Sequence, residues 1–193
     1  MSELVGRKDA NRIIPWRLIG WGGAVVLLAL PFVAMQFAVT GVNWSAGDFI
    51  FAAALFAVIG GLFEFAVRTS SNGTYRLAFG LGLLGFFATI WVNLAVGIVG
   101  SEDNSANLMF FVALLVGIVA SLSARFRPAG MARAMFITAA ALAIAFVAAQ
   151  LGHRDDPDVK PPIEAVGAGL FVLFFVGSAW LFRRAAAQSS SSS

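Results

Sequence analysis

One carboxylate of this chain stands inside a long apolar run. Glu64 is followed four residues later by Arg68, near the end of that run. An ionisable residue in hydrocarbon is costly enough to mark an ion or proton site by default. A Glu followed by an Arg at i+4 is also the favourable order for an ion pair on a helix. We predict an ion pair at the membrane boundary, with an ion or proton site as the alternative.

A short polar segment, residues 101–107, concentrates oxygen ligands. Glu102, Asp103 and Asn104 carry the carboxylate and amide oxygens that Ca²⁺ and Mg²⁺ prefer. The segment lacks the ligand spacing of an EF-hand loop, and Asp, Asn and Ser also end one helix and cap the next. A turn with a helix cap is the favoured interpretation, and a cation site is the alternative.

Neutral polar residues also lie within the apolar runs, namely Gln36, Thr89, Asn93 and Gln150. On membrane helices the three amides fall in the same half of the bilayer, with Thr89 deeper, so together they could line a polar cavity. Amide and hydroxyl side chains also join helices by hydrogen bonds across their contacts. We favour hydrogen bonding between helices over the cavity.

A basic segment, residues 125–133, contains Arg125, Arg127 and Arg133. Arginines next to a membrane helix can contact anionic lipid headgroups or an acidic partner surface. They can equally act as a topological anchor, with Pro128 starting the next helix. The two interpretations are compatible, and neither is an activity.

No catalytic residue, metal site or cofactor is predicted. The chain has no cysteine, and its one histidine, His153, lacks a second histidine for a zinc site. Residues 80–85 match the dinucleotide-binding glycine pattern, but that pattern requires a preceding strand in a soluble unit. In an apolar helix these glycines indicate close helix packing instead.

The composition of the chain indicates a membrane protein, whose helices would position these residues. Of its 193 residues, 60% are hydrophobic and 12% are charged, against about 25% charged in soluble domains. Hydrocarbon offers the backbone no hydrogen bonds, so spanning segments are helices or closed barrels, and long apolar runs favour helices. The predicted fold class is an all-α polytopic membrane helix bundle with six transmembrane helices and short loops. The six transmembrane helices are predicted at residues 18–40, 49–67, 77–99, 108–124, 131–151 and 163–182.

The predicted organisation has three parts. Residues 1–17 form a basic N-terminal segment, residues 18–184 form the six-span domain, and residues 185–193 form a disordered serine-rich tail. The basic residues are scattered between apolar runs rather than gathered on a soluble surface, so nucleic acid is not an expected partner.

The third span is predicted to be the packing centre of the bundle. Small or polar residues recur in it at four-residue spacing and form one helix face: Gly85, Thr89, Asn93 and Gly97. Bulky apolar residues cluster on roughly the opposite face: Phe87, Trp91, Leu94 and Ile98. We expect Asn93 to be buried against another helix with a hydrogen-bond partner, because an unpaired amide is costly in hydrocarbon.

The basic residues predict the orientation of the chain. All 13 lysines and arginines except Arg154 and Lys160 fall on the side that also holds both termini. Cytoplasmic loops are enriched in Lys and Arg. We therefore predict a multi-pass protein of a bacterial inner (cytoplasmic) membrane with both termini in the cytoplasm.

Four runs resemble segments of a family of small polytopic bacterial inner-membrane proteins that has no assigned activity. They are IIPWRLIGWGG at residues 13–23, WVNLAVGIVGSEDN at 91–104, ARFRPAGMARA at 124–134 and SAWLFRR at 178–184. The resemblance spans nearly the whole chain and implies the same membrane topology, without implying a mechanism. This chain departs from the family pattern at Ser105, where proline is expected, so a rigid loop is not implied there.

Three classes of function remain open. The leading hypothesis is a non-catalytic accessory or structural membrane component. It would work in the lipid bilayer by packing against a membrane-protein partner or a second copy of itself. A small-solute or ion transporter using the polar residues of one membrane half is the alternative. An intramembrane enzyme is third, because no acid, base and nucleophile set can be assembled.

Reporter fusions test the predicted topology. Fusions after Asn72 and Gly130 should give a cytoplasmic signal, and fusions after Asn104 and Asp156 an external one, because the basic residues follow that alternation. Matching signals at Gly130 and Asn104 would rule out the fourth span.

Overall fold

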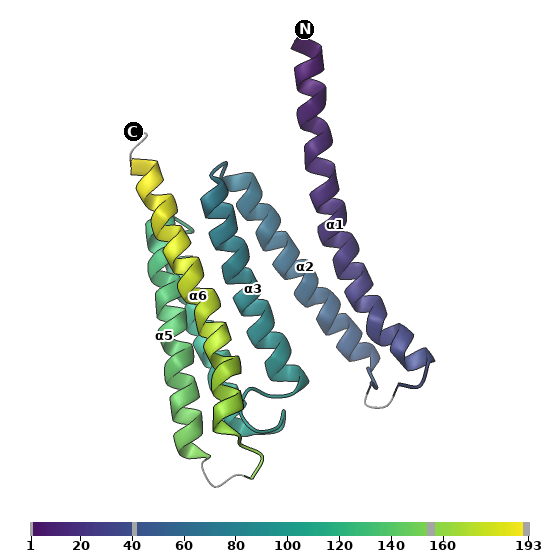
Figure 1. The fold of residues 1–193 in the computed structure, drawn as a ribbon, viewed down its shortest axis with the longest axis vertical. Coiled ribbons are helices and arrows are strands. Elements are labelled where there is room, and N and C mark those ends of the chain that lie inside the picture. The colour runs from purple at the N-terminus through teal and green to yellow at the C-terminus, as the bar shows by residue number, and fades with distance from the viewer. Residues whose placement is uncertain (1, 40–41, 154–156, 191–193) are drawn as a thin grey trace. The chain divides into compact units, whose positions relative to one another are not determined.

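A computed structural model describes residues 2–39, 42–153 and 157–190, which are predominantly helical (Figure 1). The helices are α1 (Ser2–Gln36), α2 (Ala46–Thr69), α3 (Gly73–Ala95), α4 (Leu108–Ser123), α5 (Pro128–Gly152) and α6 (Pro161–Ser190). A single 3-10 turn, η1 (Ser105–Asn107), leads into α4. None of the described residues forms a strand, and the predicted all-α fold class is confirmed.

Five helices of the described chain are long and apolar enough to cross a membrane: α2, α3, α4 together with η1, α5 and α6. The protein is therefore a multi-pass integral membrane protein. In α1 the apolar stretch is Gly20–Gln36, shorter than the predicted span at 18–40. The helix ends at Gln36, and Thr40 lies outside the described residues. A membrane crossing by α1 stays a prediction.

The chain divides into two compact units, residues 1–64 and residues 65–193. The boundary falls inside the apolar run of α2, where hydropathy does not change, and the six-span domain predicted for residues 18–184 stays a prediction. Within the first unit, Trp21 of α1 packs on Gly60 of α2 so closely that a Cβ on Gly60 would lie 2.8 Å from the indole ring. Phe32 and Phe49 add an edge-to-face contact with ring centroids 6.4 Å apart.

In the second unit, α6 lies between α3 and α5 (Figure 1). α5 packs against both α6 and α4. The buried residues of α6 recur every three or four positions and include Phe171, Phe175 and Phe182. The prediction that the third span is the packing centre is wrong, because α5 and α6 hold that place. α6 is apolar on all sides, so its sequence alone does not distinguish a central helix from a peripheral one.

Small residues allow α3 and α6 to approach closely. A Cβ on Gly85 would lie 3.1 Å from the ring of Phe175, and one on Gly82 would lie 3.0 Å from Ser178 Oγ. Ser178 Oγ donates a buried hydrogen bond to the carbonyl oxygen of Ala78 at 2.7 Å. Helix packing is therefore the role of Gly82 and Gly85, as the sequence predicts.

The predicted polar face of α3 is correct within the helix. Gly85, Thr89 and Asn93 are buried, while Leu94 is 50% exposed. The rotation of the helix about its axis therefore agrees with the four-residue pattern.

The predicted end of the third span is wrong. α3 ends at Ala95 instead of Val99, because Gly97 adopts a left-handed conformation with φ +76° and turns the chain. Ile98 follows in the turn and is buried at 5% exposure, so it does not belong to the lipid-facing side where the helical pattern placed it.

The C-terminal segment is more ordered than its composition predicts. α6 continues to Ser190, and Ala185 is fully buried. The predicted disorder is therefore wrong for residues 185–190, where alanine and glutamine extend the helix. Residues 191–193 lie outside the described residues.

Gly85→Leu should lower the thermal stability of the detergent-solubilised protein much more than Leu94→Ala does. The new side chain would have to displace Phe175, and over-packing of this kind costs about 1 to 3 kcal/mol. Leu94 is half exposed, so its truncation leaves no internal cavity. Thermal unfolding followed by circular dichroism compares the two variants, and equal losses would contradict the packing described for α3.

Candidate functional site

The segment between α3 and α4 is organised by one amide side chain. Asn107 Oδ1 accepts hydrogen bonds from the backbone N–H groups of Ile98 at 2.9 Å and Val99 at 3.1 Å. Its Nδ2 donates to the carbonyl oxygens of Val99 at 3.2 Å and Ser101 at 2.8 Å. With 4% exposure, Asn107 supplies hydrogen-bond partners that neither lipid nor a helix would give to this backbone.

Asn93 joins α3 to the same segment. Its Nδ2 donates to the carbonyl oxygen of Asn107 at 2.9 Å. Asn93 is 2% exposed, so the expected burial and hydrogen bond are both present, although the partner lies in η1 and not on a long helix. Its Oδ1 is buried without a hydrogen-bond partner in the described structure.

Glu164 ties the segment to α5 and α6. Its Oε1 accepts from the backbone N–H groups of Gly100 and Lys160, both at 2.9 Å. Its Oε2 accepts from Nε2 of Gln150 on α5. The carboxylate also lies in the first turn of α6, where the positive end of the helix dipole stabilises a negative charge. We call Asn93, Asn107, Gln150 and Glu164 the Asn107 cluster.

Only two of the four residues predicted to line a polar cavity lie in the same cluster. Asn93 and Gln150 both belong to the Asn107 cluster, whereas Thr89 Oγ1 donates to the Gly85 carbonyl oxygen of its own helix at 2.8 Å. Gln36 is exposed at the end of α1, in the other unit of the chain.

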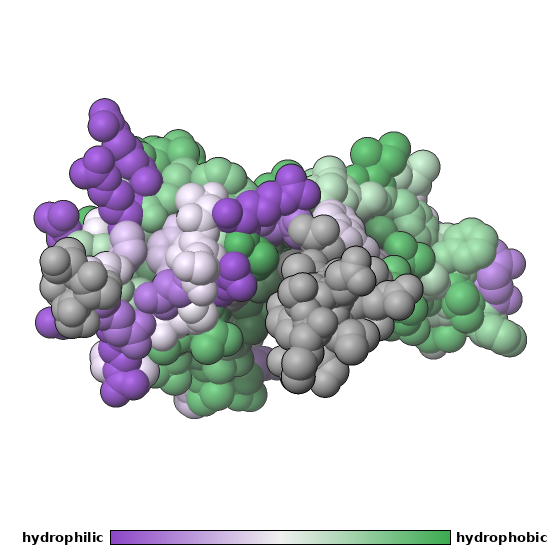
Figure 2. All heavy atoms as spheres, turned by 90° about the horizontal axis from the view of Figure 1, so that it is seen from above, coloured by the Kyte–Doolittle hydropathy of each residue, from purple (hydrophilic) through white to green (hydrophobic). Residues whose placement is uncertain are grey.

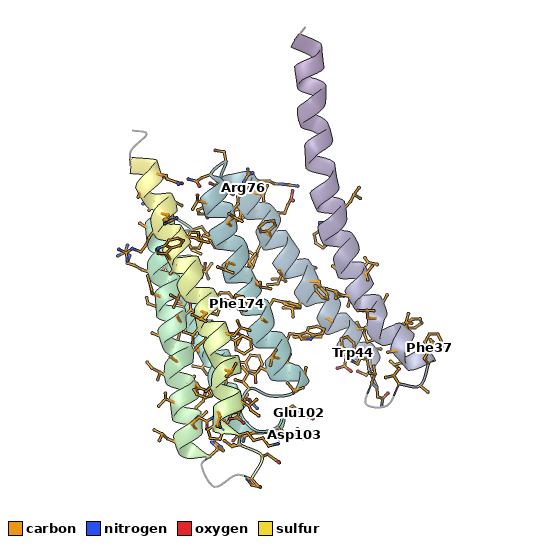
Figure 3. The ribbon with its side chains drawn as sticks, in the orientation of Figure 1. Phe37, Trp44, Arg76, Glu102, Asp103 and Phe174 are labelled. Atoms are coloured by element: carbon orange, nitrogen blue, oxygen red, sulfur yellow. The ribbon has the colours of Figure 1, made fainter. Side chains whose placement is uncertain are left out.

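The predicted cation ligands do not converge on one point. Glu102 and Asp103 are exposed, at the end of the bundle opposite Arg76 (Figure 3). Asn104 Oδ1 accepts from the Ala106 backbone N–H at 2.9 Å and so caps η1. Among the described residues, no three His, Cys, Asp or Glu side chains are grouped to hold a metal ion. The geometry favours the turn with a helix cap.

The opposite end of the bundle carries the exposed arginines. Arg125, Arg127 and Arg133 are exposed around the turn that joins α4 to α5. The turn between α2 and α3 lies at the same end, where Arg76 donates to the carbonyl oxygens of Ser70 at 2.7 Å and Val67 at 2.9 Å. We call this the arginine end; Figure 2 looks onto it and shows hydrophilic residues gathered there.

Glu64 and Arg68 lie one turn apart on α2, with Glu64 partly buried and Arg68 exposed. The ion pair between them stays a prediction.

Sequence reasoning missed the residues that do most of the bonding. The sequence did not single out Glu164, and Asn107 stood out only as the last residue of a polar segment. The available signal was position: Glu164 follows Pro161 by three residues, as an acid in the first turn of a helix does. Their partners, up to 64 residues away in sequence, leave no local pattern.

Comparisons of this chain with protein-family models, with curated proteins and with solved structures found no significant match.

Asn107→Ala should destabilise the bundle strongly, while Asp103→Ala in the same segment should have little effect. The first change removes four hydrogen bonds to buried or partly buried backbone groups, each contributing about 0.5 to 1.5 kcal/mol. Asp103 is exposed. Thermal unfolding in the same detergent measures both variants. A similar melting temperature for the two would show that the segment does not depend on Asn107.

Proposed function

We propose that this protein is a non-catalytic accessory or structural component of a bacterial inner membrane, which works by packing against another membrane protein. The observation that carries the proposal is the use made of its polar groups. In the bundle of residues 65–193, Asn93, Gln150 and Glu164 bond to other parts of the chain and hold α3, α5 and α6 to one turn.

The way the polar groups are bonded distinguishes a structural membrane protein from one that conducts a solute. A route for a solute needs polar groups that can exchange their partners with the solute. Here Asn107 has both of its N–H groups and both acceptor positions of its oxygen occupied by backbone. A bundle held in one shape in this way can present fixed helix faces to a partner in the bilayer.

Orientation and location belong to the same proposal. The arginine end would face the cytoplasm, since cytoplasmic loops are enriched in arginine, and the Asn107 cluster would lie towards the outside. The resemblance of residues 91–104 and 124–134 to segments of bacterial inner-membrane proteins supports that membrane.

A small-solute or ion transporter is the second candidate, and one observation favours it. Asn93 Oδ1 is buried without a partner, next to the point where α3 stops at Ala95. Interrupted membrane helices with free oxygen atoms are the usual ion sites of transporters.

Flux measurements separate the two candidates. The full chain, reconstituted in vesicles of phosphatidylethanolamine and phosphatidylglycerol, should carry no Na⁺, K⁺ or H⁺ above the leak of protein-free vesicles. Asn93→Ala and the half-exposed control Leu94→Ala should leave this baseline unchanged. An ion flux that Asn93→Ala abolishes in a folded protein, and Leu94→Ala does not, would replace the accessory role by transport.

Purification from bacterial membranes in mild detergent tests the accessory role itself. Native mass spectrometry should find the chain bound at fixed stoichiometry to a second membrane protein or to another copy of itself. A chain that is monomeric under every mild condition, while it retains a small solute, would contradict the proposal.

A further inference from the structure

We propose that the turn between α4 and α5 binds the phosphate of an anionic phospholipid headgroup through Arg125, Arg127 and Arg133. This inference concerns the arginine end and does not depend on the accessory role. Five observations support it: the fixed shape of the turn, the free guanidinium groups, the distance of the described carboxylates of residues 65–193, the depth of the turn relative to the membrane, and the apolar residues beside it.

The shape of the turn is fixed from inside the bundle. Arg125 and Phe126 both adopt left-handed conformations, with φ +49° and +57°, which non-glycine residues adopt only when their surroundings hold them there. The Phe126 ring packs 5.6 Å from Phe65 and 6.1 Å from Phe79, centroid to centroid. Tyr75 donates from its hydroxyl to the Phe126 carbonyl oxygen at 2.9 Å. Phe126 therefore points inwards, while Arg125 and Arg127 on either side of it are exposed.

The guanidinium groups of the turn are not engaged by the protein. The side chains of Arg125, Arg127 and Arg133 form no hydrogen bond or ion pair with any described residue. Two other arginines at this end are engaged: Arg76 bonds to carbonyl oxygens, and Arg184 lies 3.6 Å over the Trp180 ring.

No carboxylate competes for these arginines within the described part of residues 65–193. Its acids are Glu102, Asp103, Asp158 and Glu164, and all lie in or beside the segments at the opposite end of the bundle (Figures 1 and 3). An anionic ligand at the turn would therefore meet positive charge that these four carboxylates do not oppose. No side chain caps the N-terminus of α5 either, and Pro128 occupies its first turn, which adds partial positive charge at the same place.

Depth favours a lipid as the source of the phosphate. Only residues 124–127 separate α4 from α5, two helices that are apolar enough to cross a membrane. The arginines must then lie at the level of the headgroups. Leu122 at 58%, Phe136 at 40% and Ile137 at 47% exposure flank the turn on the two helices and offer acyl chains an apolar surface. A free phosphate would gain nothing from these residues.

Lipid binding to the purified full chain in neutral detergent tests the proposal. The protein is titrated with phosphatidylglycerol or with phosphatidylcholine, and lipid adducts are counted by native mass spectrometry. Phosphatidylglycerol should bind and phosphatidylcholine should not. Arg125→Gln with Arg127→Gln should weaken phosphatidylglycerol binding by about fivefold for each arginine, since an arginine near an anionic surface contributes about 1 kcal/mol.

A charge-matched control, Arg183→Gln with Arg184→Gln at the same end, should retain nearly the full affinity. Equal loss in the two double variants would overturn the assignment to the turn, as would unchanged binding after substitution of Arg125 and Arg127. Because all four residues are exposed, these variants should fold, and circular dichroism checks that they do. Competition by millimolar inorganic phosphate as effective as that by phosphatidylglycerol would overturn the lipid as the source.

Discussion

The structure of residues 65–193 depends on the hydrogen bonds of the non-helical backbone segment that follows α3. Val96 donates the last helical hydrogen bond, to the carbonyl oxygen of Val92 at 3.0 Å, and the backbone groups after it need other partners, which hydrocarbon does not offer. The side chain of Asn107 supplies hydrogen-bond partners to the backbone of Ile98, Val99 and Ser101. Glu164 does the same for Gly100 and holds the segment to α5 and α6.

Apolar runs were sufficient to predict the helices, because a backbone in lipid has almost no alternative to helix. They were not sufficient to predict the end of α3, since Val96, Ile98 and Val99 are as apolar as a membrane helix requires, although Ile98 and Val99 are buried in the turn that follows the helix. The four-residue pattern located the inner face of α3 at Gly85, Thr89 and Asn93, because that pattern is a property of a single helix. It did not reveal Glu164, whose partner Gly100 lies 64 residues away.

Charged residues divide into those that build the fold and those that remain available. Arg76 and Glu164 bond to backbone groups at opposite ends of the bundle, so each stabilises a turn. Arg125 and Arg127 flank a phenylalanine that anchors their own turn, and they are exposed. The overall charge asymmetry was visible in the sequence, but the distinction between occupied and available arginines required the contacts. The same distinction separates the polar groups of the Asn107 cluster from those of a transport pathway.

Hydrogen–deuterium exchange of the full chain in lipid nanodiscs tests the central claim most directly. If Asn107 and Glu164 hold the segment as described, the amides of Ile98, Val99 and Gly100 should exchange about as slowly as those within α3, although they belong to no helix. Exchange of these three amides within seconds, at the rate of an unbonded loop, would contradict the account.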